Sequence, residues 1–137
     1  GPGPEAALPV FNVQGLVECC NRVEVITELL RSLGAAERPL RFVEIGVEMG
    51  WLSLTLLRLF PFLEVNGVDP YYWPEEELDE QGRLIREQLN LRCDNHYNVT
   101  SKEFARFPAE RAKLYRLPSM EGVSRFEDRS VDLVFVD

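Results

Sequence analysis

The hydrophobic positions of the chain change their spacing along its length. Between residues 13 and 33 the apolar residues recur at steps of three or four, which predicts one face of an amphipathic helix, and Gly34 follows where a C-cap glycine would end it. Residues 40–46 and 63–69 are short apolar runs that predict buried strands. Between them, residues 51–59 predict a second helix, which ends before Pro61.

The second half of the chain continues this alternation of helices and strands. The acidic residues 75–80 predict the solvated first turn of a helix that continues over residues 83–90. Thr100 and Glu103 have the spacing of a capping box, which predicts the start of a separate short helix. The remaining pattern predicts a strand, a short helix and a last strand, over residues 112–117, 119–126 and 131–137.

Strands that alternate with helices predict parallel strands with right-handed crossovers. We therefore expect an α/β fold over residues 11–137, a Rossmann-like, doubly wound parallel sheet with helices on both faces. Residues 1–10 are expected to be a disordered leader or tag remnant. The last strand is apolar on both faces, which is typical of a strand with two neighbours. This predicts a domain truncated at its C-terminus and self-association through the exposed edge of strand 131–136.

Composition narrows the class of partner. The chain has 137 residues and a net charge of -8, which argues against nucleic acid or an anionic membrane as its main partner. No apolar run reaches the roughly 18 residues that span a bilayer, and no secretory signal is visible. Three cysteines, an odd number without metal-ligand spacing, suit a reducing compartment. We therefore expect a cytoplasmic protein.

Polar residues gather where the predicted strands end. Parallel sheets bind ligands beyond the carboxyl ends of their strands, so the candidate site lies there. The residues at or just past these ends are Glu44, Asp69, Ser119 and Asp137.

Two glycines mark the loop after the first strand. Gly46 allows a sharp turn and a close approach of a ligand to the backbone, and Gly50 opens the next helix. The spacing is G-x-x-x-G, and Glu48 stands where a dinucleotide motif would have its second glycine. Two hydroxyls of a ribose would suit the carboxylate of Asp69. These features favour a positively charged nucleoside without phosphates.

Three segments in order carry a resemblance to a known family: "VEIGVEMGWLS", "VNGVDPYYW" and "LPSMEGVSRFEDRSVDLVFVD". Over residues 41–137 the chain resembles the class I S-adenosylmethionine-dependent methyltransferases, in their small-molecule O-methyltransferase-like branch. The resemblance implies a seven-stranded fold of which this chain supplies the first four strands. It also implies S-adenosyl-L-methionine as cofactor and O-methylation of a small-molecule substrate.

The resemblance also implies roles for single residues. Glu44 would face the amino group of the cofactor's methionine part, which Gly46 and Gly50 would allow to pass. Asp69 would hold the ribose hydroxyls, and the adenine would lie along the pair Ser119 and Met120.

Asp137 would lie near the transferred methyl group. In metal-dependent members of the family this position is a metal ligand, so Asp137 is the candidate catalytic and metal-ligating residue. The residues present do not supply the rest of a site for a divalent metal, and the catalytic base stays unassigned.

Several of these residues also have an alternative interpretation in which their role is purely structural. Glu44 could be a surface carboxylate, the two glycines could serve a tight turn, and Asp69 before a proline could start a turn. Ser119 could be the N-cap of its helix. The aromatic residues 71–73 could line the ligand or anchor a loop.

Two other functions also stay open. One is a non-catalytic scaffold that kept the cofactor fold for interaction, and the other is a nicotinamide-dependent enzyme. A scaffold should not bind S-adenosylmethionine, which a binding measurement tests. A comparison of binding to S-adenosylmethionine and to a nicotinamide cofactor tests the second alternative.

Overall fold

A computed structural model describes residues 21–72 and 79–137 of this chain. Four parallel strands form one sheet in the order β3-β2-β1-β4. This confirms an α/β fold with helices between parallel strands, consistent with a Rossmann-like topology. The elements are α2 (Arg22–Ser32), β1 (Arg41–Ile45), α3 (Trp51–Leu59), β2 (Glu64–Val68), α4 (Glu80–Phe104), β3 (Ala112–Tyr115), α5 (Ser119–Val123) and β4 (Leu133–Val136).

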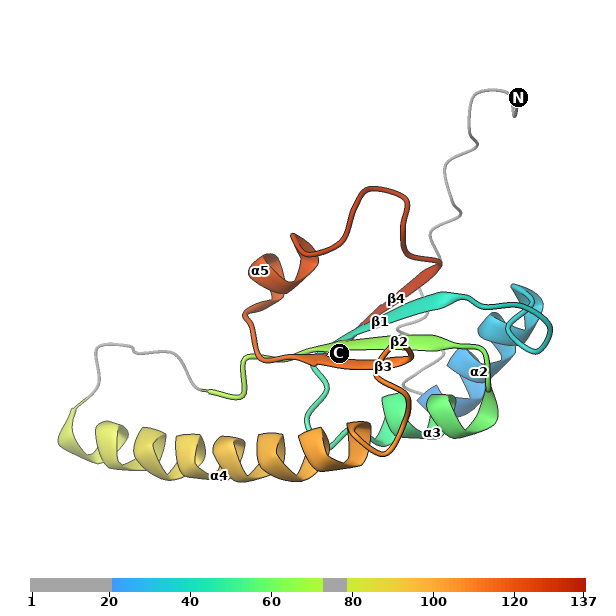
Figure 1. The fold of residues 1–137 in the computed structure, drawn as a ribbon. Helices are drawn as coiled ribbons and strands as arrows, with labels where there is room; N and C mark the ends of the chain where they lie inside the picture. The colour runs from blue at the N-terminus through green and yellow to red at the C-terminus, as the bar shows by residue number, and fades with distance from the viewer. Residues whose placement is uncertain (1–20, 73–78) are drawn as a thin grey trace.

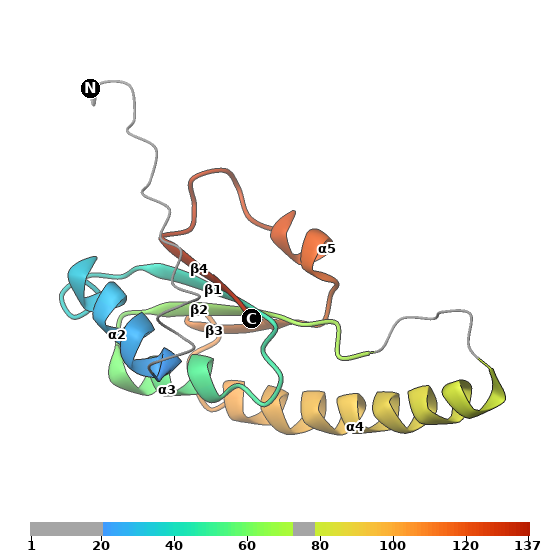
Figure 2. The same cartoon turned by 180° about the vertical axis from the view of Figure 1, so that it is seen from behind.

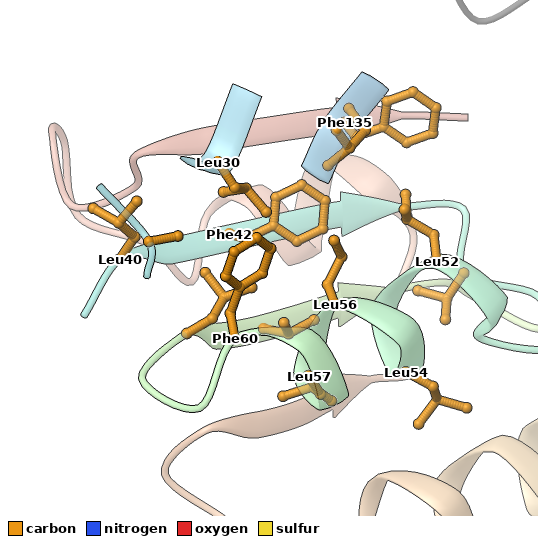
Figure 3. Close-up of a cluster of buried hydrophobic side chains, with 14 of the residues drawn as sticks. Leu30, Leu40, Phe42, Leu52, Leu54, Leu56, Leu57, Phe60 and Phe135 are labelled. Carbon is orange, nitrogen blue, oxygen red and sulfur yellow. The ribbon is translucent and has the colours of Figure 1, made fainter. Parts of the chain in front are cut away.

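Helices lie on both faces of the sheet, as the pattern predicts. Figures 1 and 2 show α2, α3 and α4 on one side and α5 alone on the other. The hydrophobic core fills the first side, where Phe42 of β1 meets Leu30 of α2 and Leu56 of α3 (Figure 3). Each such side chain, fully buried, stabilises the fold by about 1.5–3 kcal/mol.

One helix end is closed by a local glycine and another by an arginine that is distant in the chain. Gly34 has φ 97° and follows α2, and its amide donates to Arg31 O while that of Ala35 donates to Leu30 O. This is a Schellman cap, and it confirms the expected glycine at this helix end. The Arg111 guanidinium donates to carbonyls at and after the end of α3, those of Leu57, Phe60 and Leu63.

One prediction about the helices is wrong. The chain forms the single helix α4 over Glu80–Phe104, where the sequence pattern predicts two separate helices. Thr100 is buried within it and does not cap a helix start. No glycine or proline lies between residues 83 and 104 to break the helix, so the capping-box spacing is coincidental here.

The last strand, β4, lies at one edge of the described sheet. β4 pairs in parallel with β1, and Phe135 lies opposite Glu44. Among the described strands β4 has no second neighbour. Phe135 is buried in the core, whereas Val134 and Val136 of the other face are exposed. Among the described residues no helix is long and apolar enough to cross a membrane.

Candidate functional site

The carboxyl edge of the sheet brings together the side chains that the strand ends predict. Glu44 is near the end of β1, and Asp69 and Asp137 directly follow β2 and β4. The ladder joins these strands in one register, with Ile45 opposite both Val68 and Val136. The edge therefore carries three carboxyl groups at the ends of three adjacent strands.

The loop between β1 and α3 adopts conformations that favour glycine. Gly46 and Gly50 have φ 89° and 77°, in the left-handed region. A Cβ on Gly46 would lie 3.1 Å from the carbonyl oxygen of Asp137. A Cβ on Gly50 would lie 3.1 Å from Cγ2 of Thr100. Both glycines therefore serve a tight turn with close packing, Gly46 against Asp137 and Gly50 against Thr100.

Glu44 is buried, with only 1% of its surface exposed. The reading of this residue as a surface carboxylate is therefore wrong. Burial raises its pKa to about 7, although a hydrogen bond from Ser53 and the charge of Arg22 oppose this shift. The Ser53 hydroxyl donates to Glu44 Oε1 at 2.6 Å. Ser53 was not predicted as a site residue, though it and Thr55 are the only polar residues in the apolar run 51–57.

Asp69 accepts hydrogen bonds from two loops, the one after β1 and the one after β2. Its Oδ1 accepts from the Tyr71 amide at 2.8 Å, and its Oδ2 accepts from the Glu48 amide at 3.0 Å. The alternative interpretation, that Asp69 starts a turn, therefore fits the structure. A carboxylate has about four acceptor positions, so two remain for hydroxyl groups of a ligand.

Tyr71 anchors this pair of loops. It is 3% exposed, and its hydroxyl donates to the Glu48 carbonyl at 2.7 Å. Thr100 Oγ1 of α4 donates to the same carbonyl at 3.0 Å. Glu48 and Tyr71 both have positive φ, 53° and 51°, so these bonds hold strained backbone in place. Of the two readings of the aromatic stretch, Tyr71 fits the anchor, and Trp73 lies outside the described residues.

We expect Tyr71→Phe to lower the free energy of unfolding by about 1 kcal/mol, because one buried hydrogen bond is lost. Urea unfolding at neutral pH measures this change. Tyr72→Phe is the matched control, because Tyr72 is 47% exposed and should leave the midpoint unchanged. Equal midpoints for both variants would mean that the Tyr71 hydroxyl does not hold the loop.

Arg116, which directly follows β3, contacts the loop that contains Tyr71. Arg116 donates to the Tyr71 carbonyl at 3.1 Å and pairs with Asp94 of α4. Its guanidinium lies 4.8 Å from the centre of the Tyr97 ring, which in turn lies 5.3 Å from the Tyr71 ring. These contacts join residues that are far apart in the chain, and no local pattern in the sequence predicts them.

Ser119 and Met120 begin α5 beside the end of β2. α5 approaches β2 so closely that a Cβ on Gly122 would lie 2.2 Å from Cγ1 of Val68. The reading of Ser119 as an N-cap is wrong, because Pro118 holds that position and no side chain caps the helix. Met120 is 83% exposed.

Asp137 forms an ion pair with the first residue of α2. Arg22 Nη1 lies 2.5 Å from Asp137 Oδ2. Within residues 21–72 and 79–137, no three His, Cys, Asp or Glu side chains group as metal ligands. The described residues therefore form no metal centre around Asp137.

Comparisons with models of known protein families, with curated proteins and with solved structures found no match for this chain. The protein is a small α/β domain with an all-parallel sheet. Its carboxyl edge combines the glycine loop with the carboxyl groups of Glu44, Asp69 and Asp137, and the Arg22 guanidinium pairs with Asp137. These carboxylates can accept hydrogen bonds from hydroxyl and ammonium groups, and the separate carboxylate of Glu48 in the loop disfavours a phosphate.

Proposed function

We propose that this chain is the cofactor-binding part of an S-adenosylmethionine-dependent methyltransferase that acts on a small-molecule acceptor, in the first place on a hydroxyl oxygen. One observation carries the proposal. The left-handed glycines of the first loop lie at the same sheet edge as the acid that ends β2, and Asp69 bonds directly to this loop through the Glu48 amide. The expected cofactor contacts are therefore neighbours in space.

The charge and shape of the edge support a sulfonium nucleoside as ligand. Glu44 would face the ammonium group of the methionine part, directly or through water, and Asp69 would accept from the ribose hydroxyls with its remaining acceptor positions. Ser119 and Met120 at the start of α5 would border the adenine. Glu48 beside the loop disfavours a pyrophosphate, and hence the nicotinamide alternative.

When bound, S-adenosyl-L-methionine would supply an activated methyl group for an acceptor oxygen, and the electron pair of its C–S bond would stay on sulfur. The protein's part is to hold the two reactants in line. The proton of an acceptor hydroxyl must go to a base, and none is assigned among the described residues. Asp137, which would lie near the transferred methyl group, is the candidate catalytic residue. The proposal includes no step on a metal.

We expect Asp69→Ala to weaken S-adenosylmethionine binding by about 2 kcal/mol or more, roughly thirtyfold, because two hydrogen bonds to a charged acceptor are lost. Titration calorimetry on the folded variant measures this loss. Asp132→Ala is the matched control, since Asp132 also accepts from a backbone amide, that of Arg41, but at the opposite end of the sheet.

The same titration separates the alternatives. Failure of the unaltered chain to bind S-adenosylmethionine would favour the scaffold, and tighter binding of NAD would favour the nicotinamide enzyme. Equal affinities of the Asp69→Ala variant and the unaltered chain would remove Asp69 from the site.

A further inference from the structure

A groove between α3 and α4 lies apart from the three carboxyl groups of the sheet edge. We call it the α3–α4 groove, and its volume is about 270 Å³. α3 and the end of α4 lie on the same side of the sheet (Figure 1). The groove is lined by Met49, Trp51, Leu54, Arg58, Val99 and Glu103.

Four of the six residues that line the groove are apolar. Trp51 and Val99 are 75% and 43% exposed, whereas Leu54 is buried. Large apolar side chains that face water in one place are typical of binding surfaces. A closed cavity of about 150 Å³ can hold a benzene molecule, so this groove has room for an aromatic ring with a short side chain.

The polar end of the groove contains one cationic and one anionic residue, Arg58 and Glu103. Glu103 Oε2 lies 3.2 Å from Arg106 Nη1 and 3.8 Å from Arg58 Nη2. Glu103 therefore keeps its closer partner when Arg58 turns toward a ligand. The lining carries one cation, Arg58, and one anion, Glu103, whose closer partner Arg106 lies outside the lining. Arg58 is therefore the group of the groove that can pair with an anion.

We propose that the α3–α4 groove binds a small apolar carboxylic acid, whose hydrocarbon part lies on Trp51 and whose carboxylate pairs with Arg58. The apolar wall supplies affinity for the hydrocarbon part, and the arginine distinguishes an acid from a neutral or cationic analogue. The inference is independent of the proposed methyltransferase function, because its residues and its ligand are different.

Fluorescence of Trp51 tests the proposal directly. The chain has two tryptophans, so a Trp73→Phe background leaves Trp51 as the sole reporter. The probes are 4-phenylbutyrate and its neutral amide, 4-phenylbutyramide. We expect both to change the fluorescence saturably, with the acid binding about fivefold more tightly, the upper range for a solvent-exposed ion pair.

Two arginine variants identify the group that binds the carboxylate. Arg58→Gln should bring the affinity for the acid down to that for the amide. Arg106→Gln, the matched control, alters the other partner of Glu103 but not the lining of the groove, and it should keep a preference for the acid. The proposal is overturned by equal affinities for acid and amide in the Trp73→Phe background, by a preference that survives Arg58→Gln, or by the absence of saturable binding.

Discussion

The free energy of unfolding is expected to fall by roughly 3 kcal/mol, from Glu44 alone, as the pH rises from 4.5 to about 7. The sign follows from the raised pKa of this acid. In this window the folded protein retains a proton that the unfolded chain has already lost, so raising the pH favours the unfolded chain. The contribution is fully present below pH 4.5 and is lost above pH 7.

Glu44→Gln should remove this loss, because the amide is neutral at every pH and its oxygen still accepts from the Ser53 hydroxyl. The variant is then expected to be more stable than the unaltered chain at pH 8 by roughly 3 kcal/mol, and equally stable at pH 4. Urea unfolding at several pH values measures both. A variant that is less stable at pH 8 would show instead that the carboxylate stabilises the start of α3.

Glu64→Gln is the control with the opposite sign. Burial opposes ionisation of Glu64, but hydrogen bonds from Asn66 and Arg41 and the charge of Lys113 outweigh it and lower the pKa. Its contribution to stability is therefore present at neutral pH and lost on acidification.

A buried acid such as Glu44, which reduces stability at neutral pH, is expected at a ligand site. Glu44→Gln should therefore also weaken S-adenosylmethionine binding.

Gly46→Val is expected to abolish S-adenosylmethionine binding. A branched side chain would stand at the left-handed position with φ 89°, and its Cβ would already lie 3.1 Å from the Asp137 carbonyl oxygen. The strain costs of order 1–3 kcal/mol, and the side chain would fill the space over the loop. Titration calorimetry measures the binding of S-adenosylmethionine to the variant, once circular dichroism has shown that the variant is folded.

Gly34→Val controls for backbone strain alone. Gly34 has φ 97° at the end of α2, away from the candidate site, and the nearest atom to its added Cβ is the Nε of the flexible Arg38 side chain. This variant should lose stability to a similar degree and keep its affinity for the cofactor. Normal binding by Gly46→Val would mean that the ligand does not pass this loop.

The edge of the sheet could be predicted because it depends on short, local patterns. An apolar run that ends in Glu44 or Asp69 identifies a strand and its polar end, and parallel topology then places these ends together. The Schellman cap at Gly34 is equally local. These features need only the order of residues along the chain and the general rules for parallel sheets.

The features that could not be predicted depend on tertiary contacts. Thr100 has a capping-box spacing to Glu103, but its position inside a long helix and against the Glu48 carbonyl decides its role. Arg116 and Tyr97 meet Tyr71 only after β3 and α4 have been placed. A local sequence pattern cannot predict such contacts, because the two residues of each contact lie tens of residues apart in the chain.

The double hydrogen bond on the Glu48 carbonyl has a consequence for the rate and energetics of binding. Tyr71 and Thr100 set the shape of the glycine loop through contacts within the chain, so this shape is acquired when the domain folds. A ligand at this edge would meet a preorganised receptor, and the conformational entropy of the loop would not oppose its association. Substitutions at Thr100, which lies behind the loop, should therefore slow binding by loosening the loop while leaving every ligand contact intact.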